Sequence, residues 1–495
     1  MKNFSKSNKT LLIVFGLLLI LGLFAYFTMG QTSFVRTSLS GLTIGALYFM
    51  VAAGLTLVFG LMDVLNFAHG TTFMIGAYMG WQFFTNPSFL FGVAPLLIAF
   101  LAGISANTLL QVYVTQWKID ESKREWIKRG LILMALVFGL IGVWGIDFLD
   151  LAETAMVAIT FTTNPLSELS PQLPLAVFWY RPLLMLFSGA LLAVAIAGPG
   201  DKTKTLHVDN AKRGWIVVAV LIVLTIVSVL VRESGPEAVL LMNADLRFVL
   251  SLLVGALIGA GFGAAMEASL IRPLYVRPMY QVLVTLGVAY VFKEVIQVLW
   301  EPLAYQMSRP PFFSQPGKAD NLIAWFSTHN TTVDILGVTF PSYRLFIILL
   351  GILMLIGLAI LMNFTRFGMI IRAGVQDRSM VEALGINVRR VFTLVFALGA
   401  GLAALGGIGA APFIPVQPNM GDAFQLQGFI VVVIGGMGSY SGAAIGALLL
   451  GMARAFGDYL ALKFSLSPAI SEASTVIIMA IILIVKPSGL FGKKE

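Results

Sequence analysis

The chain has 495 residues, of which 58% are hydrophobic and 11% are charged, and its formal net charge is +8. Ordinary soluble domains carry about 25% charged residues, so this composition excludes a soluble enzyme, while the high hydrophobicity excludes a disordered chain. The absence of cysteine excludes disulfide frameworks, thiolate metal sites and cysteine nucleophiles.

Apolar stretches recur along the chain, and a membrane-spanning helix needs about 20 mostly apolar residues. The first stretch, 11–29, follows three lysines and lacks a clear cleavage site, so we expect a retained span rather than a signal peptide. The others lie near 38–60, 67–84, 92–116, 130–148, 180–198, 214–231, 247–271, 280–300, 344–362, 391–411, 424–436, 440–459 and 473–486. The sequence therefore predicts an all-α polytopic membrane protein, a bundle of about 10–14 transmembrane helices with possible half-helices at 67–84 and 424–436.

The lysines and arginines indicate the direction of these crossings. If the N-terminus is cytoplasmic, alternating connections place 22 of the 32 basic residues inside, as the positive-inside rule requires. Both termini are then cytoplasmic, and the long connections 149–179 and 301–343 are external. The net positive charge belongs to the inner face, so we expect no nucleic-acid partner.

Small residues and charged residues within the spans both predict helix packing. GxxxG pairs, which let helix backbones approach closely, occur at Gly41/Gly45, Gly76/Gly80, Gly255/Gly259/Gly263 and Gly442/Gly446. We expect Glu267 to face Arg272 or Arg277. Arg454 and Asp458, four residues apart, can pair on one helix face. No series of carboxylates crosses the spans, which argues against a proton- or sodium-driven transporter.

Motifs for nucleotide and metal chemistry are missing from the sequence. It contains no phosphate-binding GxxxxGK[ST] and no HExxH, and its three histidines lie in unrelated regions. We therefore expect this chain to bind neither ATP nor a metal ion, and no other cofactor is indicated. An intramembrane hydrolase would need a nucleophile paired with a base, and no such pair is evident.

The segment Asn66-Phe67-Ala68-His69-Gly70 opens the span 67–84 with two polar side chains. Asn66 can cap the helix start, and a histidine is costly in lipid, so both side chains should face protein or water. These residues alone leave two interpretations open. One is a capped helix with a hydrogen-bonded histidine, and the other is a substrate path lined by Asn66 and His69.

Residues 364–390 form an amphipathic stretch with five arginines between two spans. Within it Met380, Ala383 and Leu384 share one helix face, and Gly385 is placed to end the helix as a left-handed cap. Such a helix can lie on the membrane surface or dock into a groove of another protein. The single chain does not choose between these two partners.

Four blocks of sequence carry a resemblance to a known family. They are NFAHG with MIGAY in 41–78, E-x4-RPL with VTLGVAY in 267–300, RFGMIIRAGVQDRSMVEALGINVRR in 366–407, and VVVIGGMGSYSGAAIGALLLG in 428–451. Together with the ending KPSGLFG, they resemble the integral-membrane permeases of bacterial branched-chain amino acid ABC transporters. That family includes urea and short-chain amide permeases.

One region departs from this resemblance. In the family, the NFAHG helix is followed after a short loop by the helix that ends in E-x4-RPL, whereas here the stretch 88–245 intervenes. Its four candidate crossings are an even number, so every later span keeps its direction. We therefore expect an N-terminal part of the permease core at 1–87, an inserted helical region at 88–245, and the rest of the core at 246–495.

The resemblance implies the permease subunit of an ABC importer in the bacterial inner membrane. Its solute would be a branched-chain amino acid or a related small polar molecule such as urea or a short-chain amide. The implied partners are two cytoplasmic ATPase subunits, a second homologous permease and an external solute-binding protein, besides membrane lipid. The competing hypotheses are a secondary transporter or channel without an ATPase, and an intramembrane enzyme.

Two groups of residues are candidates for function. Asn66 and His69 are the candidates for the substrate path or its gate. The candidates for ATPase coupling all lie in the stretch 364–390: Arg372, Asp377, Glu382, Ala383, Leu384 and Gly385. No catalytic residue and no metal ligand is predicted.

Overall fold

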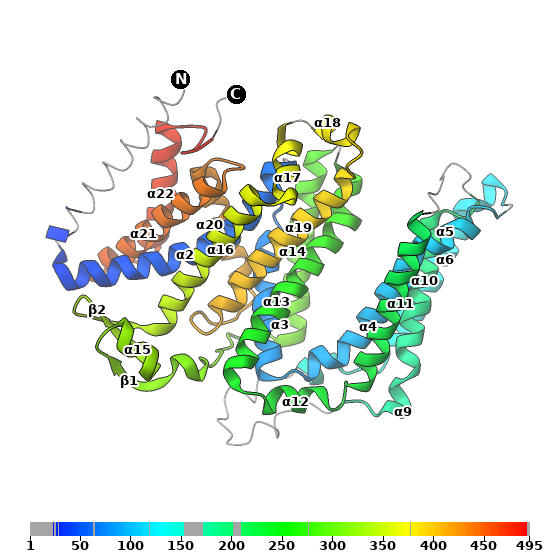
Figure 1. Cartoon of the computed structure of the whole chain (residues 1–495), viewed down its shortest axis with the longest axis horizontal. Helices are drawn as coiled ribbons and strands as arrows, with labels where there is room; N and C mark the ends of the chain where they lie inside the picture. The colour runs from blue at the N-terminus through cyan, green and yellow to red at the C-terminus, as the bar shows by residue number, and fades with distance from the viewer. Residues whose placement is uncertain are drawn as a thin grey trace. The chain divides into compact units, whose positions relative to one another are not determined.

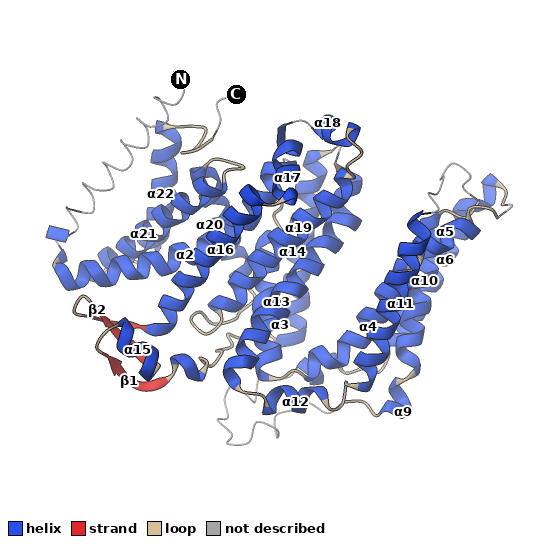
Figure 2. Cartoon of the chain, in the orientation of Figure 1, coloured by secondary structure: helices blue, strands red, loops and turns tan. Residues whose placement is uncertain are grey.

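The computed structural model describes residues 23, 26–27, 29–62, 65–117, 119–152, 172–200, 209–275, 277–376 and 378–492. The chain forms two compact units: Met1–Trp81 with Ala244–Glu495 make unit 1, and Gln82–Asn243 makes unit 2. Helices dominate both units, and the strands that are described lie in unit 1 (Figure 1 and Figure 2). The predicted first span, 11–29, lies almost entirely outside the described residues.

Many helices are long and apolar enough to cross a membrane. Within the described ranges nine helices qualify, or ten if the bent pair α11 (Asp209–Leu230) and α12 (Gly235–Leu241), inclined at 73°, is one span. Two shorter apolar helices are α20 (Met420–Gly435) and α22 (Ala469–Val485). The prediction of an all-α polytopic membrane protein is therefore confirmed, although unit 1 also carries a small sheet.

The core of unit 1 surrounds α3 (His69–Thr85), whose side chains are buried along almost the whole helix. α2 (Gln31–Met62), α13 (Ala244–Met266) and α19 (Val388–Ala410) contact α3, and α21 (Tyr440–Lys463) packs on α2. α2 runs along α19 and α21, and α13 runs along α19. The hydrophobic span 67–84, which is weak in sequence, is thus the most enclosed helix of the unit.

The predicted GxxxG contacts hold these helices together. A Cβ atom on Gly45 would lie 2.9 Å from the carbonyl oxygen of Ala447, at the crossing of α2 and α21. A Cβ atom on Gly255 would lie 2.8 Å from the carbonyl oxygen of Gly76, where α13 meets α3. Both distances are shorter than real Cβ contacts, so only glycine permits these backbone approaches.

One end of unit 1 carries α17 (Arg366–Gln376) and α18 (Arg378–Ala383), which follow α16 (Ser342–Phe364) (Figure 1). α13 ends near them in a π-helical turn, η2 (Glu267–Ile271), and a 3-10 turn, η3 (Arg272–Leu274). The chain then enters α14 (Pro278–Trp300). In the most apolar stretch of this helix, only 11% of the residues are buried. An apolar helix with so little burial fits a lipid-facing position.

The other end of α16 carries a small sheet that the sequence did not predict. The order is β1-β2-β3, with β1 (Gln315–Ala319) parallel to β2 (Asn330–Ile335), and β2 antiparallel to β3 (Val338–Pro341). The 3-10 turn η4 (Pro311–Phe313) and helix α15 (Leu322–Thr328) complete this subdomain. Its core is aromatic, with the ring of Phe313 5.6 Å from that of Trp325 and 5.4 Å from that of Tyr343.

A surface ion pair also links two strands of this subdomain. Lys318 Nζ on β1 lies 2.6 Å from Asp334 Oδ2 on β2. The hydrogen bond and charge of Lys318 hold the pKa of the Asp334 carboxyl below its ordinary value of 3.8. The ion pair lies at the surface, so it contributes little to the stability of the fold. It does show that these residues of β1 and β2 lie near each other.

Unit 2 is a helical bundle. Its elements besides α11 and α12 are α4 (Ser88–Ser105), α5 (Asn107–Val114), α6 (Glu121–Val143), α7 (Phe148–Ala152), α9 (Leu175–Phe178) and α10 (Tyr180–Ala197). α10 packs on α4 and α6, and α4 packs on α11. Arg181 is buried and donates to the carbonyl oxygen of Trp144 at 2.6 Å, which joins α10 to the end of α6. Our assignment of 88–245 as an insertion into a permease core stays a prediction.

Candidate coupling surface and substrate path

The amphipathic stretch 364–390 folds into α17 and α18 at one end of unit 1 (Figure 1). α17 turns its apolar side inward, with Ile371 only 2% exposed. Val381 in α18 is buried, whereas Met380 in the same helix and Leu384 just after it are 62% and 73% exposed. Ala383 and Glu382 are also exposed. The two helices thus present a small, mostly apolar tip at the end of the unit.

Gly385 ends α18 as predicted. Its φ is +80°, in the left-handed region that a residue with a Cβ rarely adopts. The amide of Gly385 donates to the carbonyl of Glu382 at 3.0 Å, and the amide of Ile386 donates to that of Val381 at 3.3 Å. These two bonds form a Schellman motif, which satisfies the last carbonyls of the helix and fixes where it stops.

Arg372, a predicted coupling residue, points back into its own unit. Its Nη1 atom donates to the carbonyl oxygen of Met362 at 2.6 Å and to Asn363 Oδ1 at 3.1 Å. Asn363 Nδ2 donates in turn to Tyr440 Oη at 2.9 Å. This chain of bonds ties α17 to the end of α16 and to the start of α21. Asp377, another predicted coupling residue, lies outside the described residues.

A second polar network lies beside the start of α19, just after the stretch 364–390. Glu267 is fully buried, and its Oε2 atom accepts from Arg272 Nη2 at 2.7 Å and from Thr393 Oγ1 at 2.7 Å. Its Oε1 atom accepts from Arg272 Nε at 3.2 Å and from the hydroxyl of Tyr275. A buried carboxylate is tolerated only with such partners. Thr393 belongs to the second turn of α19, so the network ties that helix to the end of α13.

The sequence explains part of this network. The π-helical turn η2 places Arg272 one turn after Glu267, because residues five apart lie on the same face of a π-helix, and the amide of Arg272 donates to the carbonyl of Glu267. The prediction that Glu267 faces Arg272 or Arg277 is therefore confirmed for Arg272. Sequence analysis missed Tyr275 and Thr393, and Thr393 lies 126 positions along the chain with no local signal to mark it.

Asn66 lies just before α3 and is buried, with 2% of its surface exposed. Its Oδ1 atom accepts from the amide of Ala68 at 3.0 Å, which is a capping bond at the start of the helix. The carbonyl oxygen of Asn66 accepts from Gln425 Nε2 at 3.3 Å, and Gln425 Oε1 accepts from the amide of Gly70. Gln425 on α20, which sequence analysis missed, thus clamps the start of α3.

His69 is also buried, with 1% exposed, between α3 and α2. Its Nε2 atom donates to the carbonyl oxygen of Val51 at 3.2 Å, since a carbonyl can only accept. Its Nδ1 atom has no hydrogen-bond partner among the described residues. The ring fits because position 54 is glycine: a Cβ atom there would lie 2.7 Å from His69 Nε2.

Comparison with known protein families identifies the family of this chain. The family model described as the permease component of the branched-chain amino acid transport system matches residues 214–486, which is more than half of the chain. This chain belongs to that family. The predicted resemblance is confirmed, and the family is one of transport permeases rather than enzymes. The chain is accordingly a multi-pass membrane protein, in agreement with its many apolar helices.

Individual relatives match a part of the chain. The high-affinity branched-chain amino acid permease protein LivH of Escherichia coli (strain K12) is 34% identical over 145 residues, 29% of this chain and 45% of LivH. BraD of Pseudomonas aeruginosa, a permease protein of the same description, is 30% identical over 161 residues, 32% of this chain and 50% of BraD. The ribose import permease protein RbsC of Escherichia coli (strain K12) is 28% identical over 217 residues, 42% of this chain and 60% of RbsC.

The chain thus spans about half the length of the curated relatives that it matches. No solved structure matches the chain.

Proposed function

We propose that this protein is the integral-membrane permease subunit of an ABC importer for branched-chain amino acids or a related small polar solute. The observation that carries the proposal is the tip of α18. It combines exposed Met380 and Leu384 with a Schellman stop at Gly385, at one end of a chain with no phosphate-binding motif. Force from ATP hydrolysis must therefore enter through such a surface contact.

The two networks at the tip supply a route for that force. A partner that moves α17 pulls on Arg372, and hence on the end of α16. A partner that moves the start of α19 pulls on Thr393, and hence on the buried Glu267 at the end of α13. Separating Glu267 from its donors within the membrane would be costly, so the network moves as one body.

The orientation and partners follow from the same proposal. The α17–α18 end lies on the cytoplasmic side, where two ATPase subunits contact it, and both chain termini lie on that side. The β1–β3 subdomain then faces outward, where a solute-binding protein delivers the solute. A second homologous permease completes the pore, and lipid covers the remaining apolar helix faces.

We further propose that Asn66 and His69 belong to the gate of the substrate path. Both are enclosed by α2, α3 and α20, so they do not line an open channel in this conformation. His69 Nδ1 has no described partner here, and a buried polar atom without a hydrogen bond is costly. Separation of α3 from α2 would expose this atom to water or solute, which favours the open state.

The test is ATP-driven uptake by the assembled transporter. The chain is co-expressed with the two ATPase subunits, the second permease and the solute-binding protein that the proposal requires, and the complex is reconstituted into vesicles. We expect uptake of labelled leucine, isoleucine or valine, urea or an amide only when ATP and binding protein are both supplied. Uptake by the purified chain alone would instead show a channel or a secondary transporter.

A further inference from the structure

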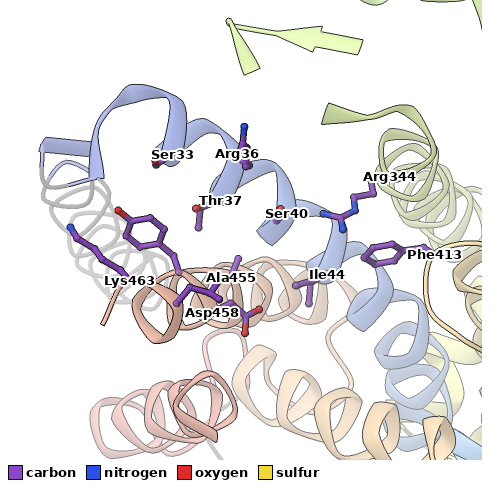
Figure 3. A pocket seen from close by; sticks show the side chains of 12 residues that line it. Ser33, Arg36, Thr37, Ser40, Ile44, Arg344, Phe413, Ala455, Asp458 and Lys463 are labelled. Carbon is purple, nitrogen blue, oxygen red and sulfur yellow. The ribbon is translucent and has the colours of Figure 1, made fainter. Parts of the chain in front are cut away.

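A cavity of about 690 Å³ lies among the first turns of α2 and α16 and the last turns of α21 (Figure 3). Its size falls within the range of small-molecule sites, which is roughly 300–1,000 Å³. All of its lining residues belong to unit 1. Neither Asn66 nor His69 lines it, and neither network around α17 and α18 reaches it.

The cavity carries more positive than negative charge. Arg36, Arg344 and Lys463 line it, and none of these three has a carboxylate partner among the described residues. Its one carboxylate is Asp458, whose Oδ1 atom lies 3.7 Å from Arg454 Nε, as the sequence predicted. Unpaired cations gathered around a hollow favour an anionic group as occupant.

Arg344 is the most constrained of these cations. Its guanidinium carbon lies 4.5 Å from the ring centre of Phe413, a cation–π contact. Figure 3 shows the guanidinium directed from α16 toward α2, with the Phe413 ring beside it. The facing wall of α2 supplies hydroxyl groups, including that of Thr37. A fixed guanidinium opposite hydroxyl donors suits a carboxylate, which accepts several hydrogen bonds in one plane.

The same hollow also has apolar walls. Ile44, Leu462 and the ring of Phe413 line it together with the charged groups. A solute with a carboxylate, an ammonium group and a branched apolar side chain would therefore find a matching partner for each part. Urea or a simple amide, which is neutral, would leave the cations without a counter-charge.

The position of the cavity along α16 fits a role in solute entry. Arg344 lies in the first turn of α16, and α17 begins two residues after Phe364, where α16 ends. With a rise of 1.5 Å per residue, the two ends of α16 are about 30 Å apart, which is the thickness of the apolar core of a bilayer. The cavity thus lies at the opposite membrane face from the proposed ATPase contact.

We propose that this cavity is an entry site for the zwitterion of an amino acid. Arg344 binds its carboxylate, Asp458 receives its ammonium group, and Ile44 and Phe413 contact its side chain. This inference rests on the proposed importer function and adds to it a site where the solute is held before it crosses the membrane.

The direct test is binding of radiolabelled leucine to the full chain in lipid nanodiscs. Loss of one charge-assisted hydrogen-bonding partner costs about 1.5–3 kcal/mol, so we expect Arg344→Gln to weaken binding roughly 10- to 100-fold. Arg344→Lys keeps the charge but not the planar guanidinium group. Its affinity for leucine should therefore lie between those of the wild type and of Arg344→Gln. Arg129→Gln on α6 removes an exposed arginine in unit 2 and serves as the matched control, with unchanged binding.

Two leucine analogues test the roles of the carboxylate and the ammonium group of leucine separately. Leucinamide lacks the carboxylate and should not compete with leucine on the wild-type chain. 4-Methylvalerate lacks the ammonium group, so it should still compete, and Asp458→Asn should not change its affinity. Asp458→Asn removes the proposed partner of the ammonium group, so it should weaken leucine binding even if Arg344→Gln fails to fold. Equal leucine binding by the wild type and by both Arg344→Gln and Asp458→Asn would overturn the proposal.

A lipid headgroup carries similar charges, so native mass spectrometry completes the test. A phosphatidylethanolamine molecule that is lost in Arg344→Gln, with leucine binding unchanged, would assign the cavity to lipid and overturn the amino-acid site. Failure of this inference is distinguishable from failure of the importer function. ATP-driven leucine uptake by the wild-type transporter, with an unchanged KM in Arg344→Gln, rejects the site and keeps the function.

Discussion

Arg272 Nη2 lies 2.7 Å from Glu267 Oε2, and the Glu267 side chain is completely excluded from solvent whereas that of Arg272 is 33% exposed. The carboxylate is therefore the costly member of the pair. Thr393 supplies a further donor from α19, so the buried charge depends on two helices that are distant in sequence. This network joins the end of α13 to the start of α19, just after the stretch 364–390.

Arg272→Gln tests this dependence. The change leaves the fully buried Glu267 carboxylate without its counter-charge, so we expect a loss of about 3 kcal/mol of stability, as for a broken buried pair. Thermal unfolding in detergent measures this loss. Comparison of the double variant Glu267→Gln/Arg272→Gln with the two single variants gives the interaction energy between the two side chains. Additive losses in the double variant would show that the two side chains do not act together.

The α18 tip should couple ATP hydrolysis to transport. Glu382→Lys reverses a charge at the proposed contact, and Gly385→Val imposes roughly 1–2 kcal/mol of strain on a left-handed position. We expect both variants to lower solute-stimulated ATPase activity and uptake together, at normal membrane abundance. Gly385→Val should also weaken co-purification of the ATPase subunits.

Each of these variants has a matched control. Gly145 lies after α6 in unit 2 with φ +71°, so Gly145→Val imposes the same strain away from the proposed contact surfaces. Glu125 is an exposed acidic residue on α6, so Glu125→Lys repeats the charge reversal in unit 2. Normal transport by Glu382→Lys and Gly385→Val would contradict the importer proposal.

Asn66→Ala and His69→Ala test the proposed gate. Each change removes about one buried hydrogen bond, worth roughly 1 kcal/mol, so we expect membrane abundance to stay within about twofold. Uptake should fall much further if the two residues act at the gate. Quantitative blotting beside uptake assays separates these effects. A loss of activity in proportion to the loss of protein would make both residues structural only.

Cysteine labelling tests the topology, and the natural absence of cysteine makes single-cysteine variants unambiguous. Ser327→Cys in α15 and Ala383→Cys in α18 place thiols at exposed positions on the opposite ends of α16. A membrane-impermeant maleimide added to intact cells should label Ser327→Cys and leave Ala383→Cys unlabelled. The reverse pattern would invert the orientation that the basic residues predict.

The Lys318–Asp334 pair predicts a pH dependence for the β1–β3 subdomain. Because the folded-state pKa of Asp334 is lowered, its contribution to stability is present above the ordinary pKa of 3.8 and is lost as pH falls through the lower folded value. Carboxyl carbon shifts measured by NMR should place the Asp334 midpoint below 3.8. Lys318→Met should return it toward 3.8, and an unchanged midpoint in that variant would exclude the ion pair as the cause.

The helices of this fold and the residues at which they end were predictable, because both depend on neighbouring residues. The apolar stretch 344–362 is recovered as α16, and Gly385 stops α18 because only its own backbone angles and the preceding turn matter. Glu267 was likewise expected to face Arg272 or Arg277, which follow it within ten residues, and the structure selects Arg272. These features require no knowledge of what packs against them.

The sequence by itself determined that this protein is a mostly helical membrane protein of the permease family, with an amphipathic segment between two of its spans. Only the tertiary structure decided the partners of its polar side chains: Thr393 for Glu267, Gln425 for the start of α3, and Phe413 for Arg344. The reason is physical. Hydropathy and capping act over a few residues, whereas a hydrogen bond between helices depends on how the chain returns to the same place more than a hundred residues later.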